Sequence, residues 1–255
     1  WRAEFVRHAL RLLTLARAFK ADAAVIDSGT MPLICLELFR RSGMKVIPVF
    51  HNAMYPLAGA SLPERLIEPF SRYALRKTAP ISVSPAVQRQ VGHGIEIRAQ
   101  FERELFDRVE PPRFAQPFNV LFLGRIEENK GVFDIVEAAR ICGSAVTWTI
   151  CGDGTDLARL KSKSAGLPID VRGWVSPEEQ VELRSKCQAV VVPTKSSFAE
   201  GLAMTAVEAI LSRRPLITNR AVPALELLRP ASVEAEPDDA RSLAGAVLSL
   251  ATDQA

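Results

Sequence analysis

The stretch "NVLFLGRIEENKGVFDIVEAARICGSAVTWTIC", residues 119–151, contains apolar runs of two kinds. The short runs at 119–124 and 146–151 have the length and composition of buried strands. Residues 131–142 between them repeat apolar side chains at helical spacing. A strand, a helix and a second strand in this order predict a parallel sheet covered by helices, which places the chain in the α/β class.

The same alternation continues on both sides of this stretch. Strands are predicted downstream at 169–173, 189–194 and 215–218, and helices at 156–164, 176–186, 203–212 and 238–252. Upstream, strands are predicted at 23–27, 45–50 and 80–84, and helices at 5–19, 32–41 and 62–77. Residues 107–117 hold three prolines and no periodicity, which is typical of a linker. We therefore expect two domains, 1–106 and 118–255, joined by 107–117.

Composition narrows the class of protein. Of the 255 residues, 48% are hydrophobic and 24% charged, as in soluble globular proteins. Residues 1–117 hold 17 Lys+Arg against 11 Asp+Glu, whereas the remainder holds 15 against 18. A modest basic surplus in the first part suits an anionic substrate or membrane surface and is too scattered for nucleic acid. The widely spaced cysteines lack metal-ligand spacing, so we expect buried thiols in a reducing cytoplasm.

One carboxylate precedes the predicted helix 203–212 and a second lies within it. Glu200 precedes it and Glu208 lies on its second turn among apolar neighbours. Because a lone buried carboxylate is costly, Glu208 needs either an arginine or amide of the protein or the hydroxyls of a ligand. The residues alone leave both alternatives open. The backbone N–H groups of Gly201, Leu202 and Ala203, at the start of the helix, favour an anion.

Other strand ends carry further polar residues. Gly124 ends a strand, and Arg125 and Lys130 follow it in the turn before the next helix, where cations suit a diphosphate. The alternative is a solvated loop in which Glu127 and Glu128 pair the cations. His51 ends the strand 45–50, a position that suits either substrate contact or a structural role. No Asp-x-Asp pair or histidine cluster is present in the sequence, so no metal site is expected.

Taken together, these stretches resemble the family 4 retaining glycosyltransferases, which have two Rossmann-like domains in the GT-B fold. "FLGRIEENKG" (122–131) looks like that family's G-R-x4-K-G segment, and "AEGLAMTAVEA" (199–209) like its E-x7-E segment. "VRGWVSPEEQ" (171–180) and "PDDARSLAGAVLSLATD" (237–253) stand in the expected order, as do "DAAVIDSG" (22–29), "VIPVFHN" (46–52) and "ISVSPAV" (81–87).

The resemblance implies how a nucleotide-sugar donor would be held. Gly124, Arg125 and Lys130 would meet the diphosphate, together with the backbone donors of Gly201, Leu202 and Ala203. Glu208 would take the ribose hydroxyls, so that the ligand rather than the protein completes its surroundings. Trp174 and Val175 would lie beside the base. Glu200 would hold the donor sugar and His51 would approach the sugar or the acceptor, which makes these two the catalytic residues. The resemblance implies no metal and no cofactor beyond the donor substrate.

Departures from the family pattern affect the hinge and the sugar-facing loop. Ala99 and Gln100 stand where an Asn-Gly pair is usual, and Arg213 stands where a glycine is common. The double glycine usual before Glu226 is missing. The resemblance also implies further strand–helix units before residue 1 and a final helix after 252, so we expect the first domain to be incomplete.

We therefore expect a cytoplasmic, retaining, metal-independent glycosyltransferase of polysaccharide biosynthesis or a related pathway. Its acceptor (a glycan, a lipid or a small molecule) stays open. Two alternatives remain: a non-hydrolysing sugar-nucleotide epimerase, and a catalytically silent nucleotide-sugar-binding module. The helix 2–20, with Arg2, Arg7, Arg11, Arg17 and Lys20, is either a solvated face or a peripheral contact with the inner face of a membrane.

Overall fold

The computed structural model describes residues 2–27, 33–57, 59 and 62–252. The chain divides into two compact units. Unit 1 comprises Trp1–Ala99 and Ala199–Leu202, and unit 2 comprises Gln100–Phe198 and Ala203–Ala255. This division differs from the predicted 1–106 and 118–255 in two respects: unit 1 ends earlier, and a short segment from the region of the two carboxylates belongs to it.

Unit 1 contains a parallel sheet whose strands follow the chain order. The strands are β1 (Ala23–Asp27), β2 (Lys45–Phe50), β3 (Ile81–Ser82) and β4 (Ile95–Glu96). The helices are α1 (Arg2–Ala18), η1 (Leu33–Cys35), α2 (Leu36–Arg41), α3 (Leu62–Leu75) and α4 (Pro85–Val91). Its core includes Leu36, Phe39, Val46, Phe50 and Leu75, which are all almost inaccessible to solvent.

Helix α4 begins where its sequence signals a helix start. Ser84 is the N-cap and its Oγ accepts a hydrogen bond from Val87 N at 3.3 Å, while Pro85 occupies the first helical position. Gly92 ends the helix with a φ of 87°, in the left-handed region that favours glycine. This helix follows the predicted strand 80–84, of which only Ile81–Ser82 pairs as β3.

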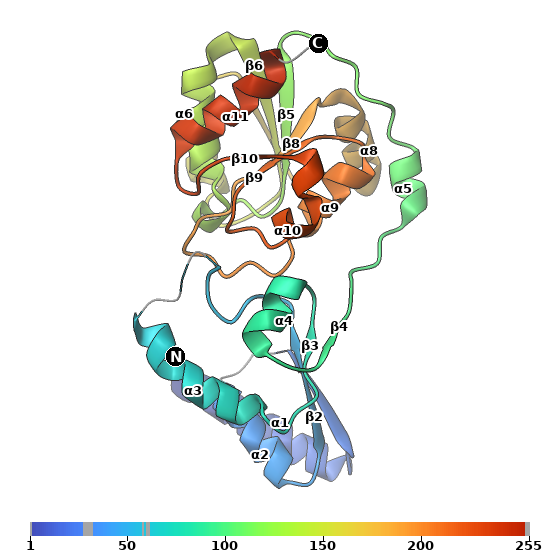
Figure 1. The fold of residues 1–255 in the computed structure, drawn as a ribbon, viewed down its shortest axis with the longest axis vertical. Helices are drawn as coiled ribbons and strands as arrows, with labels where there is room; N and C mark the ends of the chain where they lie inside the picture. The colour runs from blue at the N-terminus through green and yellow to red at the C-terminus, as the bar shows by residue number, and fades with distance from the viewer. Residues whose placement is uncertain (1, 28–32, 58, 60–61, 253–255) are drawn as a thin grey trace. The chain divides into compact units, whose positions relative to one another are not determined.

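Unit 2 contains a parallel sheet with the order β10-β9-β8-β5-β6-β7 (Figure 1). The strands are β5 (Phe118–Leu123), β6 (Val146–Cys151), β7 (Ile169–Gly173), β8 (Ala189–Val192), β9 (Leu216–Thr218) and β10 (Ser232–Glu234). The chain lays β5, β6 and β7 in one direction and then returns to place β8 on the other side of β5. Parallel sheets bind ligands at such a switch point, beyond the carboxyl ends of the strands.

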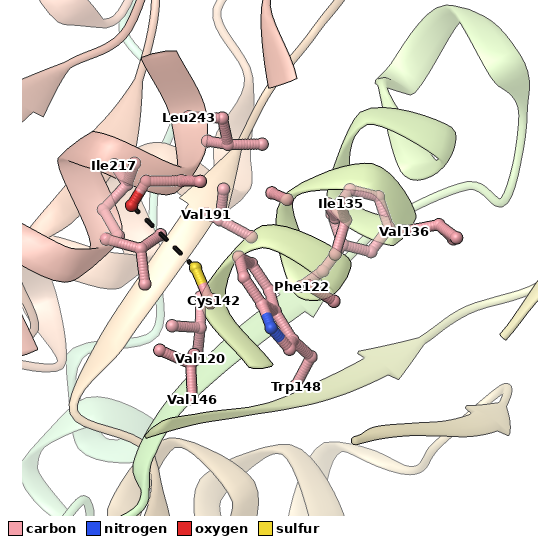
Figure 2. Packing of buried hydrophobic residues seen from close by; sticks show 14 of the residues in the cluster. Val120, Phe122, Ile135, Val136, Cys142, Val146, Trp148, Val191, Ile217 and Leu243 are labelled. Atoms are coloured by element: carbon pink, nitrogen blue, oxygen red, sulfur yellow. Dashed lines mark hydrogen bonds between the residues drawn. The ribbon is translucent and has the colours of Figure 1, made fainter. Parts of the chain in front are cut away.

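Helices cover both faces of this sheet. Figure 1 shows α6 (Val132–Cys142) and α11 (Ala240–Thr252) together on one face, and α8 (Pro177–Lys186) and α9 (Met204–Leu211) on the other. The remaining helices are α5 (Arg103–Asp107), η2 (Glu128–Lys130), η3 (Gly143–Ala145), α7 (Leu157–Lys163), α10 (Leu225–Leu228) and η4 (Arg229–Ala231). In Figure 2, Phe122 and Trp148 of the sheet pack with Ile135 of α6 and Leu243 of α11. This is the larger of the two cores.

Residues 107–117, predicted to be a linker, are bound to unit 2 by side chains. Arg213 Nη2 donates to the carbonyl of Val109 at 2.5 Å, and Arg214 Nη2 to that of Glu110 at 2.7 Å. Arg214 is fully buried, and Val109 is buried with it. Arg213 has a φ of 57°, which explains why glycine suits this position. The segment therefore belongs structurally to unit 2.

The structure confirms the α/β class with two parallel sheets. It also confirms that all four cysteines are buried free thiols. Burial raises the pKa of the Cys187 thiol to about 11, so this group is an unreactive part of the core. Within the described ranges, we find no helix with the length and apolarity that a membrane span requires.

Candidate functional site

A cavity of about 400 Å³ opens at the carboxyl ends of β5, β6 and β7 in unit 2. Its lining comprises Leu123, Gly124, Arg125, Cys151, Gly152, Asp153, Trp174, Val175, Gln180, Thr205 and Glu208. Five of the predicted donor-binding residues are among them: Gly124, Arg125, Trp174, Val175 and Glu208. The sheet therefore brings together, at its switch point, residues that span 85 positions of the sequence from Gly124 to Glu208.

Two glycines, Gly124 and Gly152, line this cavity. Gly124 N donates to the carbonyl of Cys151 at 3.1 Å, and Gly152 N donates to that of Gly173 at 2.6 Å. A Cβ at Gly152 would lie 1.8 Å from the Gly124 carbonyl oxygen, and its φ is 141°. Gly152 is thus required for the close approach of neighbouring strand ends.

Glu208 lies on the second turn of α9, as predicted, but its surroundings correct the expectation. Arg184 Nη2 of α8 donates to Glu208 Oε2. The expectation that a ligand rather than the protein completes the surroundings of Glu208 is therefore wrong. The side chain is also less buried than expected, because 24% of it is exposed to solvent. Its other oxygen, Oε1, accepts no hydrogen bond from any residue that the structure describes, and the carboxylate lines the cavity.

Arg184 is the more deeply buried partner of this pair. Only 5% of its side chain is exposed. Its Nη1 donates to Gln180 Oε1 at 3.1 Å, and its Cζ lies 5.7 Å from the centre of the Phe106 ring. Burial lowers the pKa of the Arg184 guanidinium, and the Glu208 carboxylate acts in the opposite direction. The carboxylate therefore stabilises a cation that has little access to water.

Arg125 and Lys130 share an aromatic neighbour that sequence reasoning missed. The Lys130 ammonium lies 4.3 Å from the centre of the Phe198 ring, and the Arg125 guanidinium carbon lies 5.9 Å from it. Arg125 Nη1 also donates to Glu127 Oε1 at 2.9 Å, which is the pairing that the solvated-loop alternative anticipated. Glu128 instead bonds Arg159. Arg125 lines the cavity, whereas Lys130 does not.

Trp174 and Val175 follow β7 and differ in exposure. Trp174 is 74% exposed and presents its aromatic ring to the solvent, whereas the next residue, Val175, is buried. The next residue, Ser176, is the N-cap of α8 and forms a capping box, in which Glu179 N donates to Ser176 Oγ and Ser176 N to Glu179 Oε2. Cys151 also lines the cavity, but burial raises the pKa of its thiol to about 11, which excludes a thiolate nucleophile at neutral pH.

Glu200 and Gly201 belong to unit 1, not to the unit that carries Glu208. The Glu200 carbonyl accepts from Ala53 N at 3.3 Å, and the Gly201 carbonyl accepts from Ser84 Oγ at 2.7 Å. Glu200 is 6% exposed. A Cβ at Gly201 would lie 1.7 Å from the carbonyl oxygen of His51, so this glycine is required by the protein's own backbone.

The structure divides the predicted anion-binding amides and leaves His51 at the surface. His51 follows β2 and is exposed, with its carbonyl against Gly201. Leu202 is buried in unit 1, whereas Ala203 belongs to unit 2 and is the N-cap of α9, with a φ of 63°. The helix therefore begins at Met204, one residue later than predicted.

Several neighbours of the predicted residues were not anticipated. They are Arg184, Gln180, Phe198, Thr205 and Ser84. Thr205 Oγ1 donates to the Leu123 carbonyl at 3.0 Å and so fixes the first turn of α9 to the end of β5. Of these residues, only Ser84 carries a sequence signal, because a serine before a proline marks a helix start. The others depend on contacts between distant segments.

Comparison with known proteins places this arrangement in a family. The family described as "Glycosyl transferases group 1" matches residues 104–255, which is more than half of the chain. A GDP-mannose-dependent alpha-(1-6)-phosphatidylinositol dimannoside mannosyltransferase of Mycobacterium tuberculosis is 24% identical over 211 residues, covering 74% of this chain. The chain spans about half, 54%, of the length of that relative.

Solved structures agree on the fold. A sucrose-phosphate synthase from Thermosynechococcus elongatus has a TM-score of 0.74 and 17% identity, covering 99% of this chain and 71% of its own. Anabaena HepE in complex with UDP has a TM-score of 0.72 and 16% identity, covering 94% of this chain and 71% of its own. This likeness confirms the expected fold with Rossmann-like domains. The chain belongs to the glycosyl transferases group 1 family.

Proposed function

We propose that this chain transfers a sugar from a nucleoside-diphosphate donor to an acceptor hydroxyl, with retention of anomeric configuration and without a metal. The observation that carries the proposal is the cavity at the carboxyl ends of β5–β7, which Arg125, Trp174 and Glu208 line together. A cation, an exposed aromatic ring and a carboxylate match the three parts of a nucleotide: phosphate, base and ribose.

Each part of the donor has a proposed partner. The Glu208 carboxylate accepts the ribose hydroxyl hydrogens through Oε1, since Oε2 is already bonded to Arg184. The base lies against Trp174 and Val175. Arg125 and Lys130 meet the diphosphate together with Gly124 and the backbone N–H groups of Gly201, Leu202 and Ala203. These cations and amides stabilise the charge that develops on the leaving diphosphate.

The proposed reaction conserves atoms and charge. The bond between the sugar's anomeric carbon and the diphosphate oxygen breaks, and the nucleoside diphosphate leaves with the bonding electron pair. The acceptor oxygen bonds to the anomeric carbon on the same face, and its proton passes to the departing phosphate oxygen. Glu200 holds hydroxyls of the donor sugar, and His51 contacts the sugar or the acceptor.

The identity of the donor's base is the first property to determine. The mycobacterial relative is named for GDP-mannose, and the HepE structure holds UDP, so guanine and uracil are the two bases to compare first. A thermal-shift screen of UDP, GDP, ADP and their sugar derivatives identifies the donor, because a ligand that binds the native state raises the unfolding midpoint.

The test of the function is nucleotide release by the natural, full-length protein with Glu200→Gln beside the parent. We expect the variant to lose about a hundredfold in turnover, since it removes a charged contact to the reacting sugar. Glu137→Gln on α6 is the matched control, because Glu137 lies outside the cavity and pairs Arg140. Undiminished turnover by Glu200→Gln would contradict the proposal.

Two results would favour the alternatives instead. Binding of nucleotide sugars without turnover by the parent, across a panel of acceptors, would indicate a silent binding module. A change in the donor sugar's own stereochemistry, seen by product analysis without acceptor, would indicate an epimerase.

A further inference from the structure

An exposed apolar stripe runs along helix α3 of unit 1. Leu62, Leu66, Phe70 and Tyr73 are 72%, 67%, 66% and 44% exposed. At 3.6 residues per turn these four side chains fall within a sector of about 80° around the helix axis. Leu75, about 180° from the centre of this sector, is buried in the core, and Ala74, beside the sector, is buried too. The helix is therefore anchored by one face and presents a second apolar face to its surroundings.

Cations flank this stripe. Arg65, Arg72 and Arg76 all fall within about 40° of one another along its edge, and Lys77 follows the last turn of the helix. Residues 62–77 hold four Lys+Arg against two Asp+Glu, and Arg72 pairs with one of these acids, Glu68. The Arg76 guanidinium carbon lies 4.3 Å from the Tyr73 ring centre, at the border between the charged and apolar sectors.

Unit 1 as a whole also carries a positive net charge. Residues 1–99 and 199–202 hold 14 Lys+Arg and 8 Asp+Glu, an excess of six cations. A contiguous apolar stripe bordered by cations is the pattern of helices that lie in the interface of an anionic bilayer. At 1.5 Å per residue a helix of this length is about 21 Å long, and its charged edge suits a position along the surface rather than across it.

Helix α1, which carries the basic residues first associated with a membrane, lacks such a stripe. Its exposed apolar residues, Val6, Leu10, Leu15 and Phe19, fall on two sides of the helix about 180° apart. Only a continuous apolar sector can enter a bilayer surface as one unit. The contact surface is therefore assigned to α3.

We propose that α3 docks unit 1 on an anionic lipid bilayer, with Leu62, Leu66, Phe70 and Tyr73 in the headgroup–acyl boundary and Arg65, Arg72, Arg76 and Lys77 at the phosphates. Long cationic side chains reach the phosphates while their methylene stems extend the apolar surface. This surface delivers the enzyme to a membrane and is independent of the donor cavity, so its test uses neither donor nor acceptor.

The test is co-sedimentation of the natural, full-length protein with vesicles of phosphatidylcholine, with and without phosphatidylserine, at physiological salt. We expect binding to the phosphatidylserine vesicles that weakens as salt rises. The variant Arg76→Gln/Lys77→Gln should bind roughly thirtyfold more weakly, because each cation near the surface contributes about 1 kcal/mol. Leu66→Gln/Phe70→Gln should lose roughly a hundredfold, from apolar contact.

Ile141→Gln/Leu227→Gln is the matched control, because these side chains of unit 2 are also exposed, at 50% and 44%. It should bind like the parent, and all variants should keep the parent's unfolding midpoint. Equal binding to both vesicle types, or parental binding by Leu66→Gln/Phe70→Gln, would overturn the proposal. Failure of the parent to bind phosphatidylserine vesicles would also overturn it and would indicate that polypeptide covers the stripe.

Discussion

The segment Ala199–Leu202 and the helix Met204–Leu211 each carry one acid of the same motif, yet the two acids are held differently. Glu200 is buried, and its segment is held in unit 1 through backbone carbonyls. Glu208 is 24% exposed and is fastened in unit 2 by the side chain of Arg184. Backbone carbonyls of residues 200 and 201 hold the first segment in unit 1, whereas an ion pair links Glu208 to a neighbouring helix of unit 2.

This contrast separates two ways of keeping a carboxylate at a ligand site. Backbone carbonyls hold the Glu200 segment in unit 1, and the Glu200 carboxylate itself accepts from Gly201 N at 3.4 Å. The ion pair of Glu208 uses one carboxylate oxygen for structure and leaves the second for a ligand. Substitution of Glu208 should therefore leave a buried cation without its counter-charge.

The largest effect on stability is expected for Glu208→Gln. It leaves the Arg184 cation buried without a counter-charge, and we expect the free energy of unfolding to fall by about 3 kcal/mol. Denaturant unfolding measures this change, with Glu137→Gln as the control for an exposed ion pair. A loss no greater than that of the control would show that the ion pair does not hold α8 to α9.

The second-largest effect on stability is expected for Gly201→Ala, which tests the packing of the segment Ala199–Leu202. A Cβ would meet the His51 carbonyl at 1.7 Å, so the backbone must move and the free energy of unfolding should fall by about 2 kcal/mol. Gly245→Ala in α11 is the control. Apart from the helix's own backbone, no atom lies within 4 Å of a Cβ added at Gly245. The free energy of unfolding of this variant should rise by about 0.5–1 kcal/mol, because alanine has the higher helix propensity. Equal stability of both variants would contradict the close packing of 199–202.

The smallest effect is expected for Arg184→Met. It leaves the unpaired charge on Glu208, which reaches water, so the loss should be only about 1 kcal/mol. The double variant Arg184→Met/Glu208→Gln should be more stable than Glu208→Gln alone, because it removes the buried cation as well. Additive losses in this cycle would show that the two side chains do not interact.

Much of the fold follows from the sequence. The strands 23–27, 45–50, 146–151 and 169–173 are observed with the predicted bounds. The run 146–151 is almost entirely buried, as is usual in a parallel sheet, whereas 169–173 alternates apolar and charged residues at the edge of its sheet. Short elements were missed, among them α5, α10 and the three-residue β10. Elements of this length have too few residues for a periodic pattern and are fixed by packing instead. Helix α4 was also missed, although Ser84 and Pro85 signal its start.

The candidate site follows from the sequence only in part. Strand ends identify Gly124 and Arg125, because parallel strands point their carboxyl ends to one edge, whereas Trp174 and Val175 follow only from the family resemblance. The division of Glu200 and Glu208 between two units and the pairing with Arg184 do not follow. Both depend on contacts made across 24 or more positions, which local patterns do not encode.

The most direct test of the account is the affinity of the parent protein for its nucleoside diphosphate and for the 2′,3′-dideoxy analogue, measured by calorimetry. We expect loss of the ribose hydroxyls to weaken binding by about tenfold or more, because each hydrogen bond to a charged group contributes about 1.5–3 kcal/mol. We also expect folded Glu208→Gln protein to discriminate much less between the two ligands. Equal affinity of the parent for both nucleotides would contradict a ribose contact at Glu208.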